Sequence, residues 1–284
     1  MCLILLSYNK HPVFKLVIAA NRDEFYNRPT APLEVWKNEP RVAAGRDLKG
    51  GGTWMGVSPD GRLAAITNYR DPRVLKPQAP TRGTLVTEFL TGGLSARRYL
   101  EELSGSAGDY NGFNLMVYDD EDLYFFSNRE GVVRPISTGL HGLSNHLFDT
   151  PWPKIKKGLK LFEAATATDT ISQEGIFAVL GDRKLPPDGE LPDTGVGIEW
   201  ERRLSPLFIE SDIYGTRSSS FVTIDRSGKL EFYERTYPGK SDCNPTPQTR
   251  KVSFRIAPMI SLKISSTLSY GTWQVPTFLW PPPP

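Results

Sequence analysis

Short apolar segments that end at turn-forming residues recur along this chain, and they constrain its fold most. The first two, residues 2–8 and 14–20, flank the turn Asn9-Lys10-His11-Pro12. Apolar segments of this length on either side of a turn indicate a hairpin of two buried strands. We therefore expect a β-strand to begin almost at residue 1. A signal peptide is not expected, because no basic segment precedes the apolar residues and they stop at Ser7-Tyr8.

Three more hairpins are predicted by the same pattern of two apolar segments around a turn. Their turns are rich in Asp, Gly, Ser and Pro, which are the residues that tight turns favour. The predicted pairs are 51–58 with 62–68, 111–118 with 123–127, and 219–225 with 230–234.

Helical spacing of apolar residues appears between the hairpins. Leu85, Phe89 and Leu90 predict one helix, which breaks at Gly92-Gly93 before a second that contains Leu94, Tyr99 and Leu100. A third helix is expected to begin with Thr150 as its N-cap and Pro151 as its first residue, and a fourth with Ser172 as its cap. Residues 181–197 are rich in Pro, Gly and Asp and are expected to form an exposed loop.

Hairpins separated by helices indicate an α+β protein in which helices cover antiparallel sheets. We expect residues 1–256 to form a single domain. Residues 257–284 show neither helical nor strand period and end in four prolines, so we expect a disordered C-terminal extension.

Composition excludes several classes of protein. With 34 Lys and Arg against 32 Asp and Glu, the net charge of +2 argues against a nucleic-acid-binding protein. No apolar run approaches the ~20 residues of a transmembrane helix, so no transmembrane segment is expected. Two cysteines, Cys2 and Cys243, cannot form a disulfide-rich secreted scaffold. The three histidines are scattered along the sequence, so no metal site is predicted. From the low cysteine content and the absence of a signal-peptide pattern, we expect a cytoplasmic protein that is not secreted.

Cys2 carries the sharpest chemical signal. If Met1 is removed, the thiol and a free α-amino group belong to the same residue. An α-amino group has a pKa near ~7.7–8.0 and accepts a proton at neutral pH, while a thiolate is a good nucleophile. The alternative interpretation is that Cys2 is a small buried apolar residue.

The polar segment Asn21-Arg22-Asp23-Glu24 ends the strand that should pair with the Cys2 strand. Arg22 could stabilise a thiolate, and a carboxylate could hold the α-amino group or a water. Strand alternation places Asn21 and Asp23 on one face and Arg22 and Glu24 on the other. The alternative is a solvated, charged strand end.

Further polar residues end later strands. An asparagine amide can donate a hydrogen bond to a developing oxyanion, although such asparagines also occur in ordinary turns. Arg217 precedes the last hairpin and could deliver a guanidinium to an anion, and the tryptophans, Trp54 among them, are expected in the core or lining a cleft. The candidate asparagines are Asn68, Asn111, Asn114 and Asn145.

Several motifs occur together in an order that resembles the NRDE family, also called the Transport and Golgi organization 2 family. The resemblance runs from residue 1 to about residue 256. It rests on Cys2 after Met1, Asn21-Arg22-Asp23-Glu24-Phe25, Gly51-Gly52-Thr53-Trp54, Thr67-Asn68-Tyr69, Arg82-Gly83, residues 110–115, Gly142-Leu143-Ser144-Asn145, Thr150-Pro151-Trp152 and Tyr214-Gly215-Thr216-Arg217.

The resemblance implies a four-layer αββα sandwich of the N-terminal nucleophile (Ntn) hydrolase type. By analogy with the cysteine amidohydrolases of that class, it implies Cys2 as nucleophile, Asn68 and Asn145 as oxyanion residues, and Arg217 as the late arginine. Arg22 and Asp23 would be the second-strand pair. That class spaces its Arg and Asp three residues apart, whereas here they are adjacent.

The family's cellular roles imply Golgi organisation, protein secretion, and haem or acyl-CoA and lipid trafficking, with cytoplasmic, Golgi-associated or mitochondrial placement. Besides a scaffold that would act in secretion through its surface, two functional hypotheses follow. In one, a cleft centred on Cys2 carries a small amphipathic ligand, haem or acyl-CoA, with Asn21, Glu24, Trp54, Asn111 and Asn114 as binding residues. In the other, the chain is an N-terminal cysteine amidohydrolase that cleaves a non-peptide amide and requires no cofactor.

Overall fold

The computed structural model describes residues 2–119, 122–238 and 246–256 of the chain. The first predicted hairpin lies at the centre of a six-stranded sheet. In it, β1 (Cys2–Tyr8) pairs antiparallel with β2 (Phe14–Phe25), which extends five residues further than expected. The strand order is β10-β1-β2-β11-β12-β13. The other strands are β10 (Gly139–Leu143), β11 (Tyr214–Asp225), β12 (Lys229–Thr236) and β13 (Gln248–Arg255).

A second sheet of seven strands follows the chain order from β3 to β9. Two of the predicted hairpins form its middle, β5 with β6 and β7 with β8. Its strands are β3 (Thr30–Trp36), β4 (Glu39–Asp47), β5 (Met55–Val57), β6 (Leu63–Asn68), β7 (Phe113–Tyr118), β8 (Leu123–Ser127) and β9 (Val133–Pro135).

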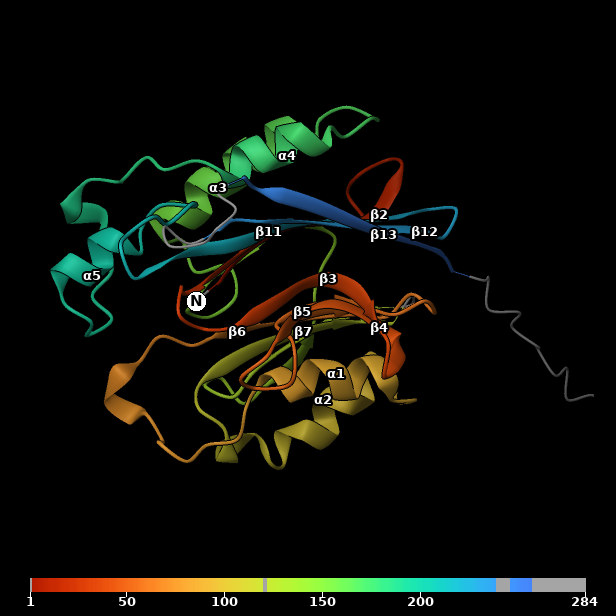
Figure 1. Cartoon of the computed structure of the whole chain (residues 1–284), viewed down its shortest axis with the longest axis horizontal. Coiled ribbons are helices and arrows are strands. Elements are labelled where there is room, and N and C mark those ends of the chain that lie inside the picture. Colours follow the sequence, from red (N-terminus) through yellow and green to blue (C-terminus); the bar gives the residue numbers. More distant parts are fainter. Residues whose placement is uncertain (1, 120–121, 239–245, 257–284) are drawn as a thin grey trace, which may run out of the picture.

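Side-chain alternation along the strands builds the layers. In β1, Ile4 and Leu6 belong to the core between the two sheets, whereas Leu3 and Leu5 pack under helices. The helices α3 (Pro153–Ala165) and α4 (Gln173–Leu180) cover the outer face of the first sheet, and α1 (Gly83–Thr91) and α2 (Ala96–Ser104) cover the second. The predicted α+β fold with four αββα layers is thereby confirmed (Figure 1).

Some predicted boundaries are wrong. The third helix has Trp152 as its N-cap and begins at Pro153, because the Thr150 hydroxyl instead donates to the carbonyl of Leu147. Ser172 caps α4 as expected. The loop predicted for residues 181–197 contains one short 3₁₀ helix, and α5 (Ile198–Arg203) follows it. The extension 257–284 lies outside the described residues. In the described part of the chain, the 3₁₀ helices are η1 (Pro72–Val74), η2 (Ala107–Asp109) and η3 (Asp188–Glu190).

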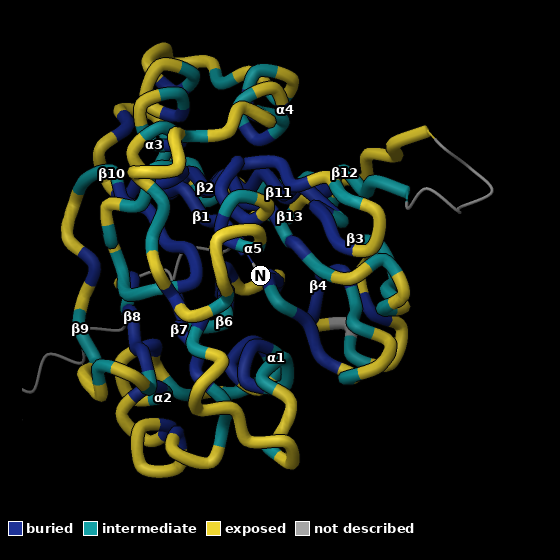
Figure 2. Tube along the Cα trace, turned by 90° about the vertical axis from the view of Figure 1, so that its left-hand side faces the viewer, coloured by how far each residue is buried: buried dark blue, intermediate teal, exposed yellow. Residues whose placement is uncertain are grey.

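Five strand ends meet at one end of the sandwich. The starts of β1, β11 and β13 lie beside the ends of β2 and β12. Figure 2 looks onto this end, with the N-terminus at the centre and with β3 and β4 beside β12 and β13. The polar residues that follow the apolar strands are therefore brought together here.

Candidate functional site

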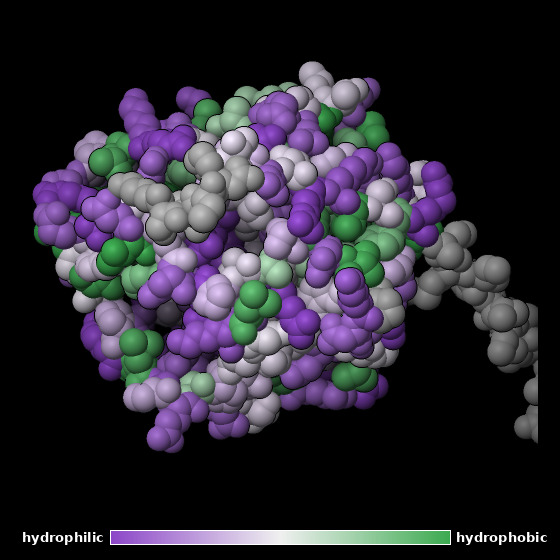
Figure 3. Space-filling model, viewed as in Figure 1, coloured by the Kyte–Doolittle hydropathy of each residue, from purple (hydrophilic) through white to green (hydrophobic). Residues whose placement is uncertain are grey.

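A cleft of about 640 Å³ lies between the two sheets at this end of the molecule. That volume falls in the range of small-molecule sites, roughly 300–1,000 Å³. Six basic and four acidic residues line this cleft. The basic residues are Arg22, Arg28, Arg46, Lys49, Arg82 and Arg217, and the acidic ones are Asp23, Glu24, Asp47 and Glu234. Figure 3 shows hydrophilic side chains gathered around the hollow between the sheets.

Cys2 lines the cleft at the first position of β1. It lies opposite Arg22 across the β1–β2 ladder, so both side chains point into the cleft. The Ser144 hydroxyl donates a hydrogen bond of 3.1 Å to the Cys2 carbonyl and fixes the start of the strand. The side chain is only 7% exposed, and burial raises the pKa of its thiol to about 11. The Cys2 side chain is therefore a neutral thiol at neutral pH.

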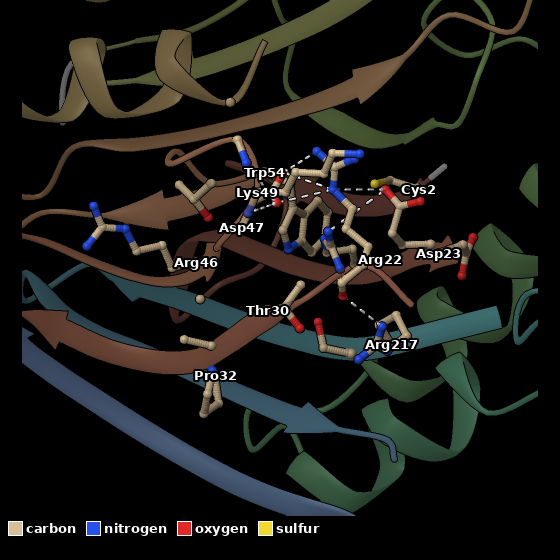
Figure 4. Close-up of a pocket in the computed structure, with 18 of the residues that line it drawn as sticks. Cys2, Arg22, Asp23, Thr30, Pro32, Arg46, Asp47, Lys49, Trp54 and Arg217 are labelled. Carbon is tan, nitrogen blue, oxygen red and sulfur yellow. Dashed lines mark hydrogen bonds and ion pairs between the residues drawn. The ribbon is translucent and has the colours of Figure 1, made fainter. Parts of the chain in front are cut away.

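Arg22 and Glu24 share the cleft face of β2, as strand alternation predicted. Glu24 Oε2 lies 3.9 Å from Arg22 Nη2 and 3.8 Å from Arg28 Nε. Arg28 in turn donates to Asp47, with 2.6 Å between Nη2 and Oδ2. A chain of alternating charges thus leads from Cys2 along the cleft to Asp47 (Figure 4).

Asn21 and Asp23 point to the opposite, helix-covered face. Asn21 is fully buried and donates to the carbonyls of Leu180 and Leu207, so it fastens the sheet to its helical layer and does not line the cleft. The Asp23 carboxylate accepts a 2.7 Å hydrogen bond from the Thr216 hydroxyl. Its residue borders the cleft, but Figure 4 shows its side chain directed away from Cys2.

Lys154 is a buried cation that sequence reasoning missed. It lies at the start of α3, two residues after the Thr150-Pro151-Trp152 motif, and its Nζ donates to the carbonyl of Leu204. Burial lowers the pKa of Lys154 to about 8, and the nearby Asp23 carboxylate opposes that shift. Burial raises the pKa of Asp23, while the Lys154 charge lowers it. The two groups therefore stabilise each other's charged forms under the Cys2 strand.

The predicted asparagines divide into two groups. Asn68 and Asn111 line the cleft, and Asn111 exchanges hydrogen bonds with the backbone of Lys76. Asn114 and Asn145 are fully buried outside it. Asn145 donates to the carbonyl of Asn68 at 2.9 Å, so it supports the backbone of the cleft and does not present its amide to a ligand.

Arg217 and Trp54 also line the cleft. Arg217 occupies a β-bulge between Thr216 and Ser218, where β11 gains one residue on β2. Its Nη1 donates to the carbonyls of Phe25, Tyr26 and Arg28. The guanidinium therefore fixes the turn after β2.

Arg82 lines the cleft and was not among the predicted site residues, although its Arg82-Gly83 motif was part of the resemblance. Two glycines place it: a Cβ on Gly52 would lie 2.3 Å from the carbonyl carbon of Gly83, so only glycine lets α1 start against this loop. Arg82 Nη1 donates to the carbonyl of Gly112 at 2.8 Å. Among the described residues, no carboxylate oxygen lies within 4 Å of its guanidinium; burial lowers the pKa of Arg82, and the Glu24 carboxylate opposes that shift from a longer distance.

The side chains that line the cleft decide whether it could coordinate the iron of a ligand such as haem. Among the described residues that line the cleft there is no histidine, and Cys2 is the one with a thiol. A thiolate would be needed for ligation, and burial of Cys2 opposes it. Within the described ranges, no group of three or more His, Cys, Asp or Glu side chains could hold a metal ion.

None of the described helices is both long and apolar enough to cross a membrane.

The four-layer αββα sandwich, with Cys2 at the start of a central strand and facing the cleft between the sheets, is the arrangement that the resemblance to the Ntn-hydrolase type implied. Similar solved structures include an N-acylethanolamine-hydrolyzing acid amidase ortholog of Caenorhabditis elegans, with a TM-score of 0.47, 9% identity, and coverage of 78% of this chain and 92% of that chain. Another is the C2A mutant of the conjugated bile acid hydrolase of Clostridium perfringens, with a TM-score of 0.48, 11% identity, and coverage of 89% and 92%.

Sequence comparison defines the family more narrowly. The family model described as Transport and Golgi organisation 2 matches residues 1–239. The Homo sapiens Transport and Golgi organization protein 2 homolog is 36% identical over 262 residues, which cover 84% of this chain and 94% of the relative. The Mus musculus homolog is 34% identical over 257 residues, which cover 83% and 93%. The chain belongs to the Transport and Golgi organisation 2 family.

Proposed function

We propose that this chain is a carrier whose Cys2 cleft binds a small amphipathic, anionic ligand, acyl-CoA or haem, and that it serves Golgi organisation and protein secretion from the cytoplasm. The observation that carries the proposal is the Arg82 guanidinium, which lines the cleft with Cys2 and Arg22 and has no carboxylate oxygen within 4 Å among the described residues. A cation held in a partly dehydrated cleft attracts an anion more strongly than it would in water.

The cleft also offers apolar surface. Trp54 and Ile66 line it together, and the backbone N–H of Ile66 donates to the carbonyl of Trp54. A ligand with both an anionic group and an apolar part therefore finds a partner for each. The names of the relatives, which refer to transport and Golgi organisation, support the cellular role.

A direct binding measurement tests the carrier. Palmitoyl-CoA and haem are titrated separately into the purified full chain and into the Cys2→Ala variant. We expect at least one of them to bind with a Kd well below about 100 μM, corresponding to more than roughly 5.5 kcal/mol. Acyl-CoA binding should survive the Cys2→Ala substitution, because the Cys2 thiol is neutral and does not hold the anionic ligand by charge. Failure of both ligands to bind the wild-type chain would overturn the proposal.

The alternative is an N-terminal cysteine amidohydrolase. The position of Cys2 on β1, opposite Arg22 and with Asn68 also lining the cleft, favours it. The test is turnover of a fluorogenic N-acyl amide by the chain with Met1 removed, compared with Cys2→Ala. If the chain hydrolyses the amide and Cys2→Ala abolishes that activity, the protein is an enzyme and the carrier proposal fails. Equal rates for the chain and the variant would exclude catalysis by Cys2.

A further inference from the structure

One register row of polar residues crosses five neighbouring strands of the first sheet. Cys2 lies opposite Arg22, Arg22 opposite Ser218, Ser218 opposite Thr236, and Thr236 opposite Gln248. Residues opposite one another in antiparallel strands share a face, and all five line the cleft. With strands spaced about 4.8 Å apart, the row from Cys2 to Gln248 is about 19 Å long.

The second sheet faces the far end of this row. Thr30, Pro32 and Arg46, from β3 and β4, line the cleft there. Behind the row, Glu234 of β12 accepts a 2.7 Å hydrogen bond from the N–H of Leu33 on β3, which ties the two sheets together. This tie closes the cleft along one side, so the space in front of the row is a groove that runs across the strands.

On the first sheet, the two ends of the row differ in chemistry, while Arg46 of the second sheet faces the far end. At the Cys2 end, Arg22 and Arg82 present guanidinium groups. At the other end, Thr236 and Gln248 present a hydroxyl and a carboxamide, which are neutral hydrogen-bonding groups. The Thr236 hydroxyl donates to the Gln248 carbonyl at 3.3 Å, so its lone pairs remain as acceptors toward the groove.

We infer that the cleft is a linear groove with a second, distal subsite at Thr236 and Gln248, and that its ligand is an elongated chain. The ligand places an anionic group at Arg22 and Arg82 and amide or hydroxyl groups along the row toward Gln248. A single file of polar side chains suits a chain with spaced hydrogen-bonding groups better than a flat macrocycle. This inference rests on the proposed carrier function and narrows the class of ligand.

Thiol footprinting along the row tests the inference. Cys243 is first changed to serine, so that Cys2 and one introduced thiol are the two cysteines of each protein. The introduced changes are Thr236→Cys and Gln248→Cys in the groove. The matched control is Thr249→Cys, which neighbours Gln248 but points to the other face of β13 because side chains alternate along a strand.

Alkylation rates are measured with and without palmitoyl-CoA at ten times its Kd, and again with haem. A site covered by the ligand should react about tenfold more slowly under these conditions. We expect palmitoyl-CoA to slow alkylation at Cys2 and at positions 236 and 248, and to leave position 249 unchanged. Thermal melting of each variant checks that it is folded.

The outcomes separate the inference from the function on which it rests. Protection of Cys2 without protection at positions 236 and 248 would overturn the distal subsite while leaving the carrier intact. Protection by haem but not by palmitoyl-CoA would overturn the elongated ligand in favour of a compact one. If both ligands bind and neither protects Cys2, the cleft is not the binding site, and the proposed function fails together with the inference.

Discussion

Replacing Arg82 with glutamine removes a cleft cation that has no carboxylate within 4 Å among the described residues, and it should weaken the binding of an anionic ligand. The magnitude follows from the contact that is lost. A hydrogen bond to a charged group contributes about 1.5–3 kcal/mol, which corresponds to roughly a tenfold to hundredfold increase in Kd. Glutamine ends two bonds short of Nη1 and loses the hydrogen bond to the Gly112 carbonyl as well, so thermal melting of the variant checks that its fold is intact.

The assay is calorimetric titration of palmitoyl-CoA into the wild-type chain and the variant at low and moderate salt. Arg97→Gln on α2 is the matched control, because Arg97 is exposed and pairs with Glu101 outside the cleft. The loss caused by Arg82→Gln should shrink as salt rises, since salt screens charges that are partly open to solvent. An unchanged Kd for Arg82→Gln, or an equal loss for Arg97→Gln, would refute the reasoning.

Three further predictions concern groups around the cleft. Because burial raises the pKa of Cys2 to about 11, its alkylation rate in a Cys243→Ser background should climb about tenfold per pH unit from pH 7 to 10; a plateau near pH 8 would contradict this. Asn145→Ala should lower the free energy of unfolding by about 1–3 kcal/mol, measured by urea denaturation, since it leaves the Asn68 carbonyl without its donor; unchanged stability would contradict the supporting role. The hydrogen bond to Asp149 raises the pKa of His141, so its stabilising effect is full below the unfolded-state pKa of about 6.5 and is lost as pH rises through the folded-state pKa. His141→Gln should therefore cost more stability at pH 6 than at pH 9, and an equal cost at both would show that the charge of His141 does not contribute.

The layered fold could be predicted because its signals are local. Each predicted hairpin joins two apolar segments across a turn, and the structure pairs all four as expected. The strands β3 and β4 were missed because polar residues such as Glu34, Arg41 and Arg46 interrupt their apolar pattern. They form by pairing with each other and with β5, a tertiary effect that no short window of sequence contains.

The site was predictable where strand alternation decides the geometry. The opposite faces of Asn21 and Arg22 follow from the two-residue period of a strand, and so does the shared face of Cys2 and Arg22 once the hairpin is paired. The inward turn of Asn145 depends on where the Asn68 carbonyl lies, 77 residues away in sequence, so sequence position gives no signal for it.

The position of Arg82 in the cleft could not be predicted from the sequence either. Its place beside Cys2 arises from the contact between Gly52 and Gly83, which brings α1 against a loop of the second sheet. The glycines themselves are visible in the sequence, but the approach of the two backbones is not. A glycine in a loop facing a glycine at the start of a helix is the signal that could have indicated it.

A crystal structure of the full chain with palmitoyl-CoA would show whether the cleft between the two sheets is a ligand-binding site. We expect ligand density along the row from Cys2 to Gln248, with an anionic or carbonyl oxygen within hydrogen-bonding distance of the Arg82 guanidinium. Ligand density on another surface, with the Cys2 cleft empty, would contradict it.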